Sequence, residues 1–282
     1  MKREVRVILG PSGAGLVQRG WIVADAEPAV TDRPYLSLVL PAYNEEQRLG
    51  ASLRKLADFL SGRGYACEVI VVDDGSTDAT SEAAERWAAS MPEGVQLRLL
   101  SHHHNLGKGA AVKTGCLAAD GEYVIFTDVD LASPLEDCER IVAALADEGY
   151  DVAIGTRIQP GGYDMRSSQP RMRRWLGRLF TFFRKRLLLP DIEDTQCPLK
   201  GFRREAARRI FAAQRLSGWA FDAEIIYLAR RYGMRVAQIP VRWEHVGGST
   251  LRVSPRTALS VLWDLLRLRY LHRRVGAKGR VG

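Results

Sequence analysis

The sequence predicts an α/β protein, in which helices flank both faces of a mainly parallel β-sheet. Between residues 35 and 156, short apolar runs alternate with segments whose apolar residues recur at helical spacing. This strict alternation is typical of parallel sheets, because each helix carries the chain back to the start of the next strand. Polar motifs directly follow three of the apolar runs, where open α/β sheets bind ligands.

The composition indicates a soluble globular protein with an anionic partner. The 282 residues are 46% hydrophobic and 26% charged, and the net charge of +8 is concentrated in the second half. The four cysteines are scattered singly, which fits a reducing compartment. No apolar run reaches the ~18 residues of a membrane-spanning helix, and the N-terminus lacks a signal-peptide pattern. We therefore expect a cytoplasmic chain that can still contact a membrane.

The chain is predicted to divide into three parts. Residues 1–34 form an uneven accessory segment with a candidate short strand at 5–9. Its G-P-S-G-A-G run lacks the Gly-Lys-Ser/Thr ending of a phosphate loop. Residues 35–255 form the α/β domain, and residues 256–282 form an amphipathic basic helix and tail. The expected strands of the domain are 36–40, 68–72, 95–100, 123–127, 152–156 and 236–241. One expected helix begins near residue 45, and others cover 79–89, 109–119, 134–148 and 204–213. Residues 218–224 open another helix, and a last helix begins at Ser254-Pro255.

The central motif is V-I-F-T-D-V-D, which ends in Asp128 and Asp130. In a strand-like geometry both carboxylates point to the same side, and their repulsion keeps one protonated unless a cation lies between them. A hard divalent ion, Mg²⁺ or Mn²⁺, with phosphate oxygens completing its coordination, relieves that repulsion. The motif therefore predicts a metal and phosphate site.

Other motifs follow the neighbouring strands. Asp73 and Asp74 can accept a hydrogen bond from a base or cap the next helix, and Tyr43 can stack on a base or pack locally. Lys108 lies between two glycines that let it approach a phosphate, although a solvated turn lysine is the alternative. The three histidines at 102–104 predict a surface loop rather than a zinc site.

Taken together, these residues resemble glycosyltransferase family 2, the inverting enzymes of the GT-A (Rossmann-like) fold. The matching motifs are P-A-Y-N-E at 41–45, V-V-D-D-G-S-T-D at 71–78, N-L-G-K-G at 105–109 and the D-x-D pair. The resemblance implies a divalent cation on Asp128 and Asp130, with Asp130 also catalytic. It implies a nucleotide-sugar site built from Pro41, Tyr43, Glu45, Asp73, Asp74, Lys108, Asp128 and Gln196.

The second half looks like the dolichyl- and polyprenyl-phosphate glucosyltransferase branch. The matching motifs are D-T-Q-C-P-L-K-G-F at 194–202 and W-A-F-D-A-E at 219–224, whereas the mannosyltransferase branch usually lacks an aspartate at the position of Asp222. The resemblance implies a hexosyltransferase that moves glucose from UDP-glucose to a polyprenyl phosphate at the inner face of the cell membrane. A soluble, polysaccharide or protein acceptor for the same donor stays open.

Basic residues of the second half supply candidates for the acceptor site. Arg157, Lys200 and Arg252 are candidates for binding the acceptor phosphate, and Arg157 is also a catalytic candidate. Asp222 is a catalytic candidate that acts as a base for a hydroxyl acceptor or orients the sugar, and a helix N-terminal charge is the alternative.

Two amphipathic basic stretches, 175–189 and 256–274, predict peripheral contact with anionic lipid. Packing against the domain or in a dimer is the plainer alternative for both stretches. No nucleic-acid-binding module is recognisable in the sequence, so we expect no nucleic-acid partner.

Overall fold

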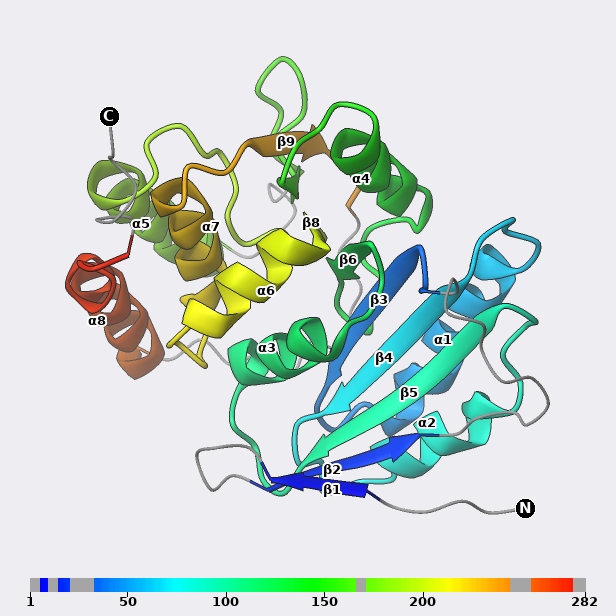
Figure 1. Ribbon diagram of the computed structural model, residues 1–282. Coiled ribbons are helices and arrows are strands. Elements are labelled where there is room, and N and C mark those ends of the chain that lie inside the picture. The colour runs from blue at the N-terminus through cyan, green and yellow to red at the C-terminus, as the bar shows by residue number, and fades with distance from the viewer. Residues whose placement is uncertain (1–5, 10–14, 21–32, 166–170, 244–254, 276–282) are drawn as a thin grey trace.

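The computed structural model describes residues 6–9, 15–20, 33–165, 171–243 and 255–275, and shows one nine-stranded sheet covered by helices on both faces (Figure 1). The strands are β1 Arg6–Leu9, β2 Gly15–Gly20, β3 Leu36–Ala42, β4 Cys67–Asp73, β5 Val95–His102, β6 Tyr123–Phe126, β7 Val152–Thr156, β8 Lys200–Arg203 and β9 Val236–Pro240. The helices are α1 Glu46–Leu60, α2 Thr80–Ala88, α3 Lys108–Ala118, α4 Glu136–Ala146, α5 Arg171–Leu187, α6 Arg204–Ala213, α7 Phe221–Arg231 and α8 Pro255–Leu271.

The sheet order is β1-β2-β5-β4-β3-β6-β8-β7-β9. Strands β5, β4, β3 and β6 are parallel neighbours, and this part is the predicted doubly covered sheet. Strand β8 runs antiparallel between β6 and β7, so β7 points in the same direction as β6. Strands β1 and β2 pair with each other and add an antiparallel edge to β5.

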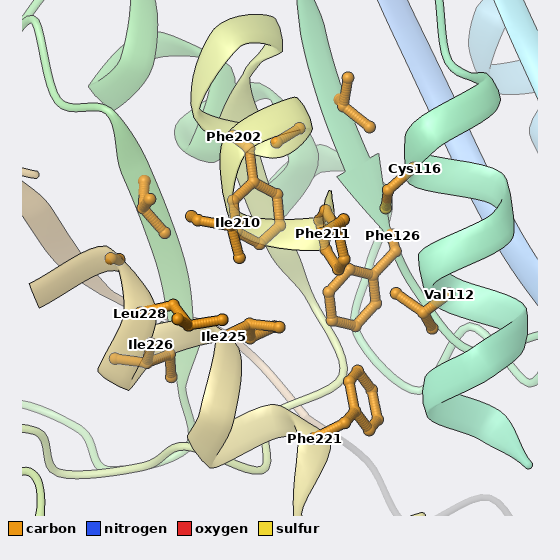
Figure 2. Close-up of a cluster of buried hydrophobic side chains, with 14 of the residues drawn as sticks. Val112, Cys116, Phe126, Phe202, Ile210, Phe211, Phe221, Ile225, Ile226 and Leu228 are labelled. Carbon is orange, nitrogen blue, oxygen red and sulfur yellow. The ribbon is translucent and has the colours of Figure 1, made fainter. Parts of the chain in front are cut away.

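Each face of the sheet has its own apolar core, because successive residues of a strand point to opposite faces. In β3, Leu38 and Leu40 pack toward α1, α2 and α4, whereas Val39 packs toward α3, α6 and α7. The second of these cores contains an aromatic group in which Phe126 lies near Phe202 and Phe221 (Figure 2). Helix α8 adds Leu265 and Leu268 to the same core.

The predicted α/β fold is confirmed, and the structure adds two strands that we did not expect from the sequence, β2 and β8. Strand β8 lies in the segment that we identified only as a motif, and it has four residues that are too few to show an alternating pattern. Residues 6–9 form the short strand that the accessory segment was expected to contain. Among the residues that the structure describes, none of the helices combines the length and apolar character of a membrane span.

Candidate active site

The predicted nucleotide and metal residues of the first half of the domain lie at the carboxyl ends of the parallel strands. Strand register places Ala42 at the end of β3 beside Asp73 at the end of β4, and Asp73 in turn beside Ser101 of β5. Tyr43 follows β3 directly and is 43% exposed, which leaves its ring available to a ligand. The site therefore occupies one edge of the sheet, as the order of the motifs predicts.

The D-x-D pair lies in a turn that follows β6, and not in the strand-like geometry that we expected. The amide of Leu131 donates to the carbonyl oxygen of Asp128 at 3.1 Å, and Leu131 has a positive φ of 47°. The buried Val129 between the two aspartates accepts a hydrogen bond from Ser52 through its carbonyl oxygen, which fixes the turn on α1. Burial, and next the charge of Asp128, raise the pKa of Asp130 above its usual value. The two carboxylates thus interact as predicted, although the backbone follows a different path.

Lys108 lies beside Asp128 at the start of α3. Its Nζ is 2.5 Å from Asp128 Oδ1, and 5.6 Å from the centre of the half-exposed Trp219 ring. Burial alone lowers the pKa of Lys108, but the carboxylates of Asp128 and Asp222 hold it above its usual value. The lysine is therefore a fixed cation next to the D-x-D pair rather than a solvated turn residue.

The glycines on either side of Lys108 serve a purpose that differs from our expectation. A Cβ atom on Gly107, whose φ is +100°, would lie 2.6 Å from the carbonyl oxygen of Ser217, and one on Gly109 would lie 2.8 Å from that of Leu216. The two glycines thus allow the backbone of residues 216–217 to pack closely against the backbone on either side of Lys108. We call residues 105–109 the donor loop and residues 214–219 the support segment.

Asp74 holds the donor loop in place. Its carboxylate accepts hydrogen bonds from the amides of Leu106 at 3.0 Å and Gly107 at 2.8 Å, and it contacts His102 Nδ1 at 2.7 Å. His102 is buried at the end of β5, so the predicted surface loop begins one residue later, with the exposed His103. The nucleotide-binding role expected of Asp74 stays a prediction.

The loops after β3 and β4 are tied together. Asn44 Oδ1 accepts from the amide of Thr77 at 2.9 Å, and the amide of Asn44 donates to Ser76 Oγ at 2.9 Å. Asp73 accepts from the amide of Ser76 at 2.9 Å and from the Ser81 hydroxyl. Asn44 is a positioning residue that the sequence motif contained but to which we assigned no role.

Glu45 also belongs to this acidic edge, and it follows β3, the strand that contains Pro41. Its carboxylate lies 2.9 Å from Arg48. Burial raises the pKa of Glu45, Arg48 opposes this, and Asp130 and Asp128 raise it further. The carboxylates of Glu45, Asp128 and Asp130 therefore share one region of negative potential that favours a cation.

Asp222 approaches the same region from α7. It is buried and its Oδ1 lies 2.5 Å from Nζ of Lys200, whose side chain is fully buried and which also donates to the carbonyl oxygen of Cys197. Burial raises the pKa of Asp222, while Lys200 and Lys108 oppose that rise. The aromatic contact between Phe126 and Phe221, whose ring centres are 6.0 Å apart, joins the residues that precede Asp128 and Asp222 (Figure 2). The core thus places the D-x-D turn and Asp222 relative to each other.

Arg157 follows β7 and is held by a residue that we did not predict. Its Nε and Nη2 donate to Asp194 at 2.7 and 2.9 Å, and its guanidinium lies 5.5 Å from the Trp243 ring. Asp194 also accepts from the amide of Gln196 at 3.1 Å. The structure thus brings Arg157 and Gln196 together around Asp194. Arg252 lies outside the described residues.

A divalent cation fits the donor set of this edge. Asp128 Oδ1 is a buried oxygen that faces Nζ of Lys108 at 2.5 Å. Carboxylate oxygens are the ligands that Mg²⁺ and Mn²⁺ prefer. Within the described residues no three His, Cys, Asp or Glu side chains form a metal-binding group, so such a cation requires oxygen ligands from elsewhere, such as a diphosphate.

Known proteins resemble this chain in both sequence and fold. The model of "Glycosyl transferase family 2" matches residues 37–211. The dolichyl-phosphate beta-glucosyltransferase of Dictyostelium discoideum is 34% identical over 85% of this chain and 75% of its own length, and that of Homo sapiens is 35% identical over 86% and 79%.

Among solved structures, glucosyl-3-phosphoglycerate synthase from Mycobacterium tuberculosis, in complex with Mn²⁺ and UDP-glucose, superposes with a TM-score of 0.56. It is 20% identical and covers 88% of this chain and 81% of its own. This likeness confirms the GT-A fold. The family match and the curated relatives show the class of enzyme: the chain belongs to glycosyltransferase family 2 and is a hexosyltransferase similar to the dolichyl-phosphate beta-glucosyltransferases.

Proposed function

We propose that this enzyme transfers glucose from UDP-glucose to the phosphate of a polyprenyl or dolichyl lipid, with inversion at the anomeric carbon. The observation that carries this proposal is the cluster of Asp128, Asp130, Lys108 and Asp222 at one edge of the sheet. A fixed cation beside a pair of carboxylates suits a donor whose leaving group is a diphosphate. The relatives named for dolichyl phosphate and glucose supply the acceptor and the sugar.

Asp128 and Asp130 are the residues that hold Mg²⁺ or Mn²⁺ in this proposal. Bound there, the cation would supply positive charge that stabilises the diphosphate leaving group. Lys108, which already faces Asp128, binds the diphosphate from the side of α3. Tyr43, Glu45 and Asp73, together with Pro41, line the nucleoside side of the donor, and Asp74 keeps the donor loop in position.

The acceptor phosphate supplies its own nucleophile. A phosphate monoester is largely ionised near neutral pH, so an oxygen attacks the anomeric carbon without a strong base while the bond to the UDP oxygen breaks. The buried Asp222, held by Lys200, orients the sugar, and its raised pKa is set mainly by burial. Arg157, oriented by Asp194, is the candidate for the acceptor phosphate, with Lys200 and Arg252 as the other predicted ligands.

Helix α8 supports the membrane part of the proposal. Its side chains Trp263, Leu266 and Tyr270 are 64%, 51% and 66% exposed, while Leu265 and Leu268 are buried on the opposite side. Phe182 of the neighbouring α5 is 63% exposed. Exposed apolar side chains among arginines suit an anionic lipid surface, which brings the enzyme to an acceptor that resides in the bilayer.

Release of UDP from a panel of UDP-sugars, measured with Mg²⁺ or Mn²⁺, tests this function. Release that requires a short polyprenyl phosphate, prefers UDP-glucose and disappears in Asp130→Ala supports it. If the enzyme binds UDP-glucose in a metal-dependent way but the lipid phosphate does not stimulate UDP release, the proposed acceptor is contradicted. That result favours a soluble, polysaccharide or protein acceptor.

A further inference from the structure

We propose that Glu224 and His272 are positioning residues for the donor loop, and that they connect the C-terminal helix α8 to the lysine at the diphosphate site. This inference rests on the proposed role of Lys108 in binding the donor diphosphate. Glu224 is the last residue of the W-A-F-D-A-E motif, but we assigned it no role from the sequence, and His272 lies outside all the motifs of the resemblance described above. Both side chains are buried, at 0% and 1% exposure, and both are polar.

Glu224 fixes the backbone of the support segment. Its two carboxylate oxygens accept hydrogen bonds from the amides of Arg215 at 2.9 Å and Leu216 at 2.8 Å. A fully buried carboxylate is strongly destabilising unless its acceptors are satisfied. The partners here are backbone amides, so the carboxylate determines where the support segment lies relative to α7.

The support segment in turn fixes the donor loop. The amide of Gly109 donates to the carbonyl oxygen of Ser217 at 2.8 Å, and Gln214 Nε2 donates to the carbonyl oxygen of Gly109 at 2.8 Å. Gly107 and Gly109 lie so close to this segment that neither position has room for a Cβ atom. Because Lys108 stands between these glycines, a small shift of the support segment moves its ammonium relative to Asp128.

His272 completes the connection from α8. Its Nε2 donates to Glu224 Oε1 at 2.6 Å, so the imidazole is the third hydrogen-bond partner of the buried carboxylate. The end of α8 has a second attachment, in which Arg231 donates to the carbonyl oxygen of Val275 at 2.9 Å without involving Glu224. The chain therefore contains a matched control, because the two attachments hold the same helix end and only one leads to the donor loop.

The test measures the dissociation constant of UDP for the full chain by calorimetry at a fixed Mg²⁺ concentration. We expect His272→Phe to raise this constant about tenfold, which corresponds to about 1.4 kcal/mol. We expect Arg231→Ala to change it by less than about twofold, because the Glu224 contacts stay intact. In a Lys108→Ala background, the effect of His272→Phe should fall below about twofold, since the two substitutions then affect the same contact.

A second variant and a second measurement keep the test decisive if His272→Phe folds poorly. His272→Gln retains a donor for Glu224, and we expect a UDP dissociation constant within about twofold of wild type. In the absence of UDP, the amide resonances of Gly107 and Gly109 should shift in His272→Phe and stay unchanged in Arg231→Ala.

Any of three results overturns the inference. His272→Phe binds UDP as tightly as wild type, Arg231→Ala weakens UDP binding as much as His272→Phe does, or His272→Phe has the same effect on UDP binding in the Lys108→Ala background as in wild type. Failure of the wild-type protein to bind UDP contradicts the proposed function itself, and is thereby distinguished from failure of the connection.

Discussion

Lys200→Met removes the ammonium that faces Asp222 and keeps a side chain of similar length. In the native structure the ammonium lies 2.5 Å from the Asp222 carboxylate, and both side chains are at most 6% exposed. Removing one partner of a buried ion pair leaves an uncompensated charge and costs about 3–5 kcal/mol. That loss is a large part of the about 5–15 kcal/mol by which a typical protein is stable.

The loss should depend on pH, because Asp222 is an acid in a buried position. Burial raises the pKa of Asp222 and Lys200 opposes the rise, so removal of Lys200 raises that pKa further. When the pKa of a carboxyl is higher in the folded than in the unfolded protein, the protein becomes less stable as the pH rises above the unfolded-state pKa. The destabilisation by Lys200→Met should therefore be small near pH 4 and increase toward about pH 8, as Asp222 ionises.

Urea denaturation of both proteins at about pH 5 and about pH 8 measures this difference. Lys185→Met is the matched control. Lys185 forms an ion pair with Glu193 at 2.7 Å on the surface, and such a pair should contribute at most about 1 kcal/mol to the free energy of unfolding. A Lys200→Met protein as stable as wild type near pH 8, or equally destabilised at both pH values, refutes this account of the pair. In a Lys200→Met/Asp222→Asn variant, part of the loss should be recovered.

Three further predictions concern the loops and the lipid surface. Asp74→Ala leaves the amides of the donor loop without their acceptor, and we expect a loss of about 2–4 kcal/mol with weaker UDP binding, measured by denaturation and calorimetry. Gly75→Ala should destabilise by about 2 kcal/mol or more, because its Cβ would lie 2.3 Å from backbone, whereas Gly94→Ala, with a φ of +80° and open space, should cost about 1 kcal/mol; equal losses in denaturation contradict the steric argument. Trp263→Ala with Leu266→Ala should reduce co-sedimentation with anionic vesicles about tenfold and leave UDP affinity unchanged, and unchanged sedimentation contradicts the assignment of this face.

The parallel part of the fold was readable from the sequence because each of its elements has a strong periodic pattern. Apolar residues such as Leu49 and Leu53 recur at helical spacing, and the apolar runs of β4 and β6 are continuous because both faces are covered. Strand β8 was missed, since four residues between β6 and β7 depend on tertiary contacts rather than on a pattern of their own.

The sequence predicted which residues lie together at the candidate site better than it predicted their geometry. The D-x-D pair and Lys108 were assigned from residue type and order, and the structure brings Lys108 to Asp128. The turn after β6 depends on a hydrogen bond between Ser52 and Val129, which are 77 residues apart, and no local pattern encodes it. The same reason applies to the pairs Arg157–Asp194 and Glu224–His272, because no local pattern predicts which two residues the fold brings together.

Transfer of labelled glucose from UDP-glucose into the organic phase, with a short polyprenyl phosphate and Mg²⁺, tests the central claim most directly. The account predicts a glucosyl phospholipid with β configuration in the wild-type reaction, and none in Asp130→Ala. The proposed acceptor would be contradicted if the wild-type enzyme binds UDP-glucose but the label stays in the water phase when the lipid phosphate is present.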